Sequence, residues 1–204
     1  MNFVPDNLYH IFNQGNNHQK IFANHEDYLI FMREMRVCIC PFMELIAYCL
    51  MPNHFHLMSY VDLRVAERIK QGGLTLDPLT NGFRKLLSSY TRIHNLKYQR
   101  SGSLFRQKTK SKCLSDKILL NPQYSFQDYY QNCFNYIHQN PVKASLVERL
   151  EDWEYSSYKD YARLRNGTLC NKTLAEKYCN YQTSTFHEDS CCLVDDSFGR
   201  MIMI

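Results

Sequence analysis

The 204-residue chain lacks any long apolar run. No stretch approaches the ~20 consecutive apolar residues that a membrane-spanning helix needs. The N-terminal segment "MNFVPDNLYHIFNQG" also lacks a basic region followed by an apolar one, which is the pattern of a secretory signal. We therefore expect a cytoplasmic protein, and its length suits one domain with its own hydrophobic core, alone or with an appendage.

C-x-x-C pairs are also absent, although the chain has nine cysteines. An odd number of cysteines without metal-type spacing disfavours both a disulfide framework and a zinc site. Several cysteines lie inside apolar segments, where a reduced thiol packs as a small hydrophobic side chain. We expect reduced, structural cysteines. The adjacent Cys191 and Cys192 are the one pair of note.

Acidic residues are missing from residues 81–115, where the basic side chains gather. The basic residues there are Arg84, Lys85, Arg92, Lys97, Arg100, Arg106, Lys108, Lys110 and Lys112. With +4 for the whole chain and +9 for this segment, the rest of the chain carries −5. A basic segment on an otherwise acidic protein predicts a surface that binds a polyanion, with a solvated basic face as the alternative.

The order of the predicted elements favours an α+β fold, with helices packed on an antiparallel sheet. We predict a strand at 8–17, a hairpin over 42–61, helices over 25–40, 63–71, 79–100, 125–139 and 143–150, and an extended basic segment at 101–114. The helix over 125–139 is expected to stop where Asn140 precedes Pro141. We expect one domain over 1–162 and a C-terminal extension of unknown role over 163–204, where no recognisable sequence block occurs and the last ~30 residues show weak periodicity.

Two histidines follow the predicted turn at Pro52-Asn53. Side chains at positions i and i+2 of a strand point to the same face, so His54 and His56 lie together, about 7 Å apart at Cα. Two imidazoles so placed can converge on one divalent cation, with a third ligand from another element. The alternative is two half-exposed histidines on a sheet surface.

The helix before Pro141 offers the second part of a site. Tyr136 and Asn140 are four residues apart and therefore share one helix face, at the edge of the buried stripe. A phenol is a weak nucleophile at neutral pH, but a metal held by imidazoles can polarise a phosphate for attack. Basic side chains would hold the flanking nucleotides. Together these parts favour transfer of a phosphodiester to tyrosine, with a 3′-hydroxyl as leaving group. A metal-dependent hydrolase is a weaker alternative, since we find no third histidine or acidic set in a comparable block.

Five blocks resemble a known family, in the same order from about residue 9 to residue 161. "YCLMPNHFHLM" (48–58) resembles the His-hydrophobic-His block of the single-tyrosine HUH transposases (IS200-like). "NYIHQNPVKASLV" (135–147) resembles the tyrosine block of their REP-associated branch. "YHIFNQGNN", "SGSLFRQKTKSK" and "DWEYSSYKDY" resemble the first strand, the basic segment and the aromatic stretch after the tyrosine helix.

The resemblance implies a ferredoxin-like α+β fold and a Mg²⁺- or Mn²⁺-dependent activity that nicks and rejoins single-stranded DNA near hairpins. It implies that His54, His56 and Asn140 are metal ligands and that Tyr136 is the nucleophile. Gln14 is a departure, because the family more often has Arg before that glycine. A domesticated, non-catalytic nucleic-acid-binding protein of the same fold is the alternative. A monomer and a homodimer both stay open, and we expect association with the nucleoid.

Overall fold

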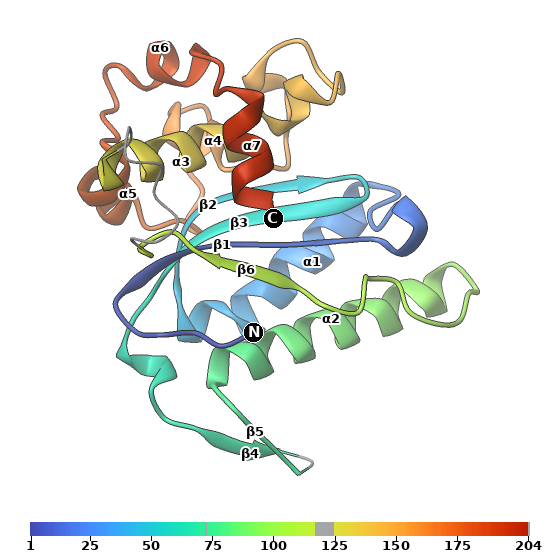
Figure 1. Ribbon diagram of the computed structural model, residues 1–204. Coiled ribbons are helices and arrows are strands. Elements are labelled where there is room, and N and C mark those ends of the chain that lie inside the picture. Colours follow the sequence, from blue (N-terminus) through green and yellow to red (C-terminus); the bar gives the residue numbers. More distant parts are fainter. Residues whose placement is uncertain (72, 117–124, 204) are drawn as a thin grey trace.

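The computed structural model describes residues 1–71, 73–116 and 125–203. Its main sheet has four antiparallel strands in the order β2-β3-β1-β6. The strands are β1 (Asn7–Gln14), β2 (Glu44–Met51), β3 (His54–Val61) and β6 (Lys110–Cys113). Helix α1 (His25–Cys38) links β1 to β2, and α2 (Pro78–Lys97) precedes β6. This is the ferredoxin-like arrangement, so the predicted α+β fold is confirmed (Figure 1).

The two faces of the sheet are covered by different helices (Figure 1). Side chains alternate between faces along a strand. From β3, Phe55 and Leu57 therefore enter the core that α1 and α2 cover. Met58 enters the core on the opposite face, beneath α3 (Phe126–Lys143). His54 and His56 belong to this second face, so the sheet separates the packing of α1 and α2 from the predicted chemistry.

Helix α1 begins at a reciprocal cap that also ties it to α2. The side chain of Asn24 accepts a hydrogen bond from the backbone of Asp27, and Asp27 accepts from the backbone of Asn24. The buried Asp27 carboxylate also bonds Lys97 Nζ at 2.8 Å and the hydroxyl of Tyr98 at 2.8 Å. These bonds join the first turn of α1 to the last turn of α2.

Helix α3 does not end before Pro141, and the predicted stop was wrong. The helix continues to Lys143, with the backbone N–H of Ala144 bonded to the carbonyl of Asn140. Proline lacks the N–H that would donate to the carbonyl of Ile137, but the helix continues through this one missing bond. Asn140 Nδ2 donates to the carbonyl of Tyr136 at 2.7 Å.

Two further predicted helices are also absent. Residues 63–71 form a 3₁₀ turn over Leu63–Val65 and the strand β4 (Ile69–Gln71), which pairs with β5 (Leu74–Leu76). Residues 144–149 form no helix, and a 3₁₀ turn over Leu150–Asp152 follows. Both segments are short, and short apolar patterns fit a turn or a strand as well as a helix.

The C-terminal segment forms helices that pack beside α3 (Figure 1). They are α4 (Tyr158–Tyr161), α5 (Lys172–Cys179), α6 (Phe186–Cys191) and α7 (Asp196–Met203). The division at residue 162 stays a prediction. In the described part of the chain, no helix is both long enough and apolar enough to cross a bilayer.

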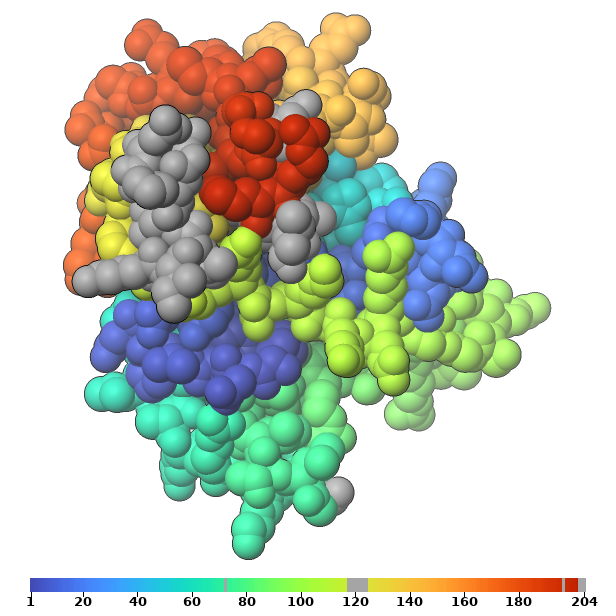
Figure 2. All heavy atoms as spheres, viewed as in Figure 1, coloured from blue at the N-terminus to red at the C-terminus, as the bar shows by residue number. Residues whose placement is uncertain are grey.

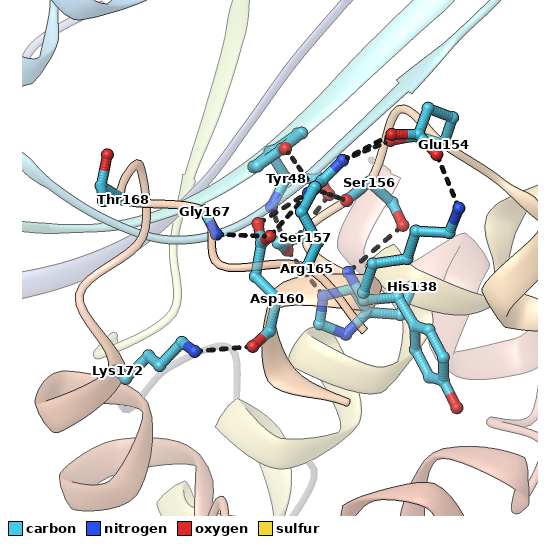
Figure 3. Close-up of polar contacts among 12 residues, drawn as sticks. Tyr48, His138, Glu154, Ser156, Ser157, Asp160, Arg165, Gly167, Thr168 and Lys172 are labelled. Atoms are coloured by element: carbon cyan, nitrogen blue, oxygen red, sulfur yellow. Dashed lines mark hydrogen bonds and ion pairs between the residues drawn. The ribbon is translucent and has the colours of Figure 1, made fainter. Parts of the chain in front are cut away.

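A polar network anchors the segment 153–167 to β2 and α3 (Figure 3). Arg165 forms two bonds with the buried carboxylate of Asp160, at 2.7 and 3.0 Å, and a third with the hydroxyl of Tyr48. The hydroxyl of Ser157 lies 2.7 Å from Nε2 of His138 and accepts from the backbone N–H of Tyr48 at 3.0 Å. This network fixes α3, and with it the tyrosine helix face, against the sheet.

Candidate active site

His54 and His56 lie together on one face of β3, as the strand spacing predicts. Their ring centroids are 5.0 Å apart, and the planes are nearly perpendicular. Phe55, between them, is fully buried on the opposite face, against Phe31 and Phe105. His56 is buried, whereas His54 is half-buried and lines two cavities.

Each of the two imidazoles has one nitrogen in a hydrogen bond and the other available for coordination. Nδ1 of His54 lies 2.6 Å from Oδ1 of Asn53, an acceptor, so Nδ1 donates and the lone pair is on Nε2. Nδ1 of His56 lies 2.9 Å from Nε2 of His10. Nε2 of His56 is buried and has no hydrogen-bond partner among the described residues. This orphaned atom beside a second available imidazole nitrogen fits a metal ligand pair.

Both imidazoles are in the neutral form that coordination requires. Burial, and then the nearby His18, lower the pKa of His54 to about 4. Burial, followed by the neighbouring His10 and His54, lowers the pKa of His56 well below its ordinary range. A neutral imidazole is the metal-binding form.

His10 is a third histidine at the site, which the sequence analysis missed. It projects from β1, is fully buried, and stacks on His56 with ring centroids 5.1 Å apart. Because its Nε2 faces Nδ1 of His56, it acts on that ligand through a hydrogen bond. The signal in the sequence was one imidazole at an inward position of the otherwise apolar stretch "LYHIF".

Tyr136 lies against this histidine cluster. Its ring centroid is 5.8 Å from that of His56 and 6.3 Å from that of His10, with near-perpendicular planes. Asn140, one turn later on α3, has its amide nitrogen bound to the Tyr136 carbonyl. Its Oδ1 is therefore the end of the amide that a cation could use. The four predicted site residues are thus brought together within one chain.

The C-terminal helix α7 packs on the tyrosine. A Cβ built on Gly199 would lie 2.9 Å from Cε2 of Tyr136, so only glycine lets α7 approach this closely. Lys143 lies with Nζ 5.8 Å from the centroid of the tyrosine ring. Tyr136 keeps 9% of its surface exposed.

Two cavities meet at His54. The tyrosine cavity, of ≈ 430 Å³, is lined by Met51, His54, Tyr136, Asn140, Lys143, Ala144, Gly199 and Arg200. The basic cavity, of ≈ 200 Å³, is lined by Phe12, Asn13, Gln14, His54, Phe55, His56, Arg106, Lys108 and Lys110. Within the described residues, no cluster of three or more His, Cys, Asp or Glu side chains could hold a metal.

Arg106 is positioned by the loop after β1. Its Nη2 lies 3.3 Å from Nε2 of His18, which must accept because a guanidinium only donates. The other ring nitrogen of His18 lies 2.7 Å from the amide of Gln14. Gln14, the departure from the resembled family, thus lies in the basic cavity, which draws its charge from Arg106, Lys108 and Lys110.

The basic segment 81–115 divides into several groups. Four of its arginines line a groove of ≈ 820 Å³ along α2, here the α2 groove: Arg84, Arg92, Arg100 and Arg106. Arg106 therefore belongs both to this groove and to the basic cavity. In Figure 2 the segment 101–112 (yellow-green) crosses one face of the molecule beside α7 (red).

The other three predicted DNA contacts lie elsewhere. Lys97 forms ion pairs with Glu26 and Asp27 at 2.6 and 2.8 Å and so stabilises the start of α1. Lys112 donates to the carbonyl of Met201 in α7. Lys85 is exposed on α2, outside the residues that line the α2 groove. Their part in DNA binding stays a prediction.

Comparison with known proteins supports the resemblance drawn from the sequence. No family model matches the chain. A Haemophilus influenzae protein named "Putative REP-associated tyrosine transposase" is 31% identical over 121 residues, which are 58% of this chain. The chain spans about 60% of the length of that relative. The relative bears the family name that the five sequence blocks indicated, so the resemblance is confirmed.

A solved structure has the same fold. It is described as "Structure of the REP associates tyrosine transposase bound to a REP hairpin" and superposes with a TM-score of 0.54 at 15% identity. The match covers 84% of this chain and 92% of the solved one. At this identity the likeness establishes the fold alone.

Proposed function

We propose that the chain is an endonuclease and strand transferase that nicks and rejoins single-stranded DNA near hairpin or repeat sequences, through a 5′-phosphotyrosine at Tyr136. The observation that carries the proposal is the position of the Tyr136 ring, 5.8 Å from His56 in the same chain. The curated relative named as a REP-associated tyrosine transposase supports the same class of reaction.

His54, His56 and Asn140 would hold a divalent cation, Mg²⁺ or Mn²⁺. Nε2 of His56, unpartnered among the described residues, and Oδ1 of Asn140, whose amide nitrogen is already bonded, are suited to this role. When bound, the cation would polarise the phosphate and neutralise its charge. Two neutral imidazoles and one amide oxygen leave coordination positions for phosphate oxygens and water.

The residues of the chain supply the nucleophile and hold the strand. The Tyr136 oxygen attacks phosphorus, loses its proton, and becomes bonded to the 5′-phosphate, while the 3′-oxygen leaves and gains a proton. Lys143 and Arg200 line the tyrosine cavity and are placed to bind the phosphates of the linked strand. Since the phosphotyrosine keeps the energy of the phosphodiester bond, a 3′-hydroxyl can reverse the step.

The partner we propose is single-stranded DNA with a hairpin, bound in the nucleoid. The solved protein of the same fold is described as bound to a REP hairpin. The groove and cavity that Arg106 joins offer a basic surface for such a ligand. Histidines and tyrosine from one chain support a site completed within a single protomer.

The test is formation of a covalent adduct. We expect the protein, with Mn²⁺ and a hairpin-bearing single-stranded DNA, to give a complex that survives denaturing electrophoresis. Tyr136→Phe should give none. Tyr130→Phe, a matched change on the same helix where the hydroxyl bonds Ser115, should still give it. An adduct that persists in Tyr136→Phe would contradict the assignment.

A second candidate is the non-catalytic nucleic-acid-binding protein. The packing of α7 on Tyr136, with Gly199 against the ring, favours this candidate, because this contact gives the tyrosine ring a structural role that needs no catalysis. On this view the wild-type protein binds hairpin DNA but gives no adduct with any sequence, and Tyr136→Phe preserves the biological role.

A further inference from the structure

His54 lies where the tyrosine cavity and the basic cavity meet, and among the described residues it alone lines both. Tyr136 and Asn140 line the tyrosine cavity. Arg106, Lys108 and Lys110 line the basic cavity. A strand that crosses the metal ligands therefore has one end in each cavity, and the two ends meet different side chains.

The chemistry of phosphoryl transfer decides which end lies where. The attacking and leaving oxygens are roughly in line through phosphorus. The Tyr136 oxygen attacks from the tyrosine cavity, so the leaving 3′-oxygen must be on the far side of the phosphorus. The basic cavity, which adjoins the tyrosine cavity at His54, is the neighbouring space that can receive it.

We propose that the basic cavity binds the DNA on the 5′ side of the cut, the strand that leaves with a free 3′-hydroxyl. The tyrosine cavity binds the DNA on the 3′ side, which becomes linked to Tyr136. This inference rests on the proposed function and adds the polarity of the bound strand. In the forward step the bond from the tyrosine oxygen to phosphorus forms and the bond from phosphorus to O3′ breaks. The phenol loses one proton and O3′ gains one.

The lining of the basic cavity suits a strand that must stay in place until rejoining. It holds three cations and no carboxylate among the lining residues. Lys110 Nζ lies 6.0 Å from the centroid of Phe12, so charge and an aromatic ring stand together, as in proteins that bind single strands. A retained 3′-hydroxyl is what reversal of the reaction requires.

Arg106 extends the same path into the α2 groove. The path continues along Arg100, whose Nη1 is buried without a hydrogen-bond partner among the described residues, and on to Arg92. The geometry therefore assigns to this groove the DNA that lies further upstream of the cut.

The experiment starts by finding a cleaved sequence. A single-stranded DNA pool with a fixed hairpin and randomised flanks is incubated with Mn²⁺, and the DNA that becomes linked to the protein is sequenced. Substrates are then shortened separately on the 5′ and on the 3′ side of the cut. The affinity of each is measured for the wild type, for Lys108→Ala/Lys110→Ala, and for Lys70→Ala as a matched control. Lys70 is exposed on the separate hairpin of β4 and β5.

We expect the double variant to bind the full substrate about 10-fold more weakly, because two phosphate contacts are lost. A substrate with one nucleotide left on the 5′ side should bind the double variant and the wild type equally. Shortening the 3′ side should weaken both proteins alike, and Lys70→Ala should match the wild type throughout. The double variant should also need about 10-fold more free 3′-hydroxyl oligonucleotide to rejoin a preformed adduct.

Two results would overturn the inference, and they differ. If shortening the 3′ side, rather than the 5′ side, abolishes the difference between double variant and wild type, the polarity is reversed while the proposed function stands. If the wild type gives no adduct from the pool, the proposed function fails and the polarity falls with it.

Discussion

Replacing His10 by phenylalanine tests whether the buried histidine pair prepares the metal site. Phenylalanine keeps a planar ring in the fully buried position but removes Nε2 of His10, which lies 2.9 Å from Nδ1 of His56 and must accept from it when Nε2 of His56 is the metal ligand. His56 would then carry its proton on either nitrogen, and the tautomer protonated on Nδ1, which leaves Nε2 free for the metal, would no longer be favoured by a hydrogen bond. Loss of such a supporting partner typically costs 10–100-fold in metal affinity, or about 1.4–2.7 kcal/mol.

The measurement is a Mn²⁺ titration followed by electron paramagnetic resonance of the free ion. A Tyr136→Phe background with hairpin DNA present prevents turnover. We expect His10→Phe to weaken Mn²⁺ binding by about 10–100-fold, and His10→Gln, whose side-chain oxygen can accept, to recover part of it. His94→Phe, a change at a buried histidine on α2, controls for loss of an imidazole as such. Unchanged Mn²⁺ affinity in a folded His10→Phe protein would refute the reasoning.

Three further predictions test the separation of core and site. Phe55→Ala should lower the free energy of unfolding by about 3–5 kcal/mol, because its ring is fully buried. His56→Ala should abolish cleavage and leave thermal denaturation near that of the wild type. Equal losses of stability in the two variants would argue against this division. Asp27→Asn should destabilise the protein at neutral pH. Burial alone would raise the pKa of this carboxyl, but its ammonium, amide and hydroxyl donors outweigh burial and lower the pKa below 3.8. The Asp27 carboxylate therefore contributes to the free energy of unfolding above pH 3.8, and this contribution is lost as the pH falls through the lowered pKa. The free energies of unfolding of variant and wild type should converge in acid. A difference that stays constant with pH would contradict this prediction. Asn140→Asp should weaken Mn²⁺ binding despite its added charge, because a carboxylate cannot donate to the Tyr136 carbonyl that now orients the side chain; tighter binding in the same titration would show that this bond is dispensable.

The strand histidines could be placed from the sequence because their relation is local. Alternation along one strand is enough to put His54 and His56 on one face and Phe55 on the other. The helical spacing of Tyr136 and Asn140 is local in the same sense.

His10 could not be found this way, because its partner is set by the pairing of two strands distant in the chain. The ladder pairs Phe12 with His56 and His10 with Met58. The contact between His10 and His56 is a diagonal across that ladder. Only the register of β1 on β3 reveals it.

The end of α3 and the C-terminal helices were missed for tertiary reasons. Proline usually marks a boundary, but α3 packs on the sheet and continues past Pro141 to Lys143, which local rules do not count. Helices as short as α5 and α6 show little periodicity and rest on packing against α3.

The tight turn at Pro52 and Asn53 constrains how this protein can diverge. Strands β2 and β3 are paired on both sides of that turn, and β3 is paired again with β1. One residue inserted or deleted there would shift β3 by one position, turning the aromatic ring of Phe55 toward the tyrosine helix and both imidazoles into the hydrophobic layer. Natural variation in the length of this turn should therefore come in steps of two residues or not at all, wherever the histidine pair is retained.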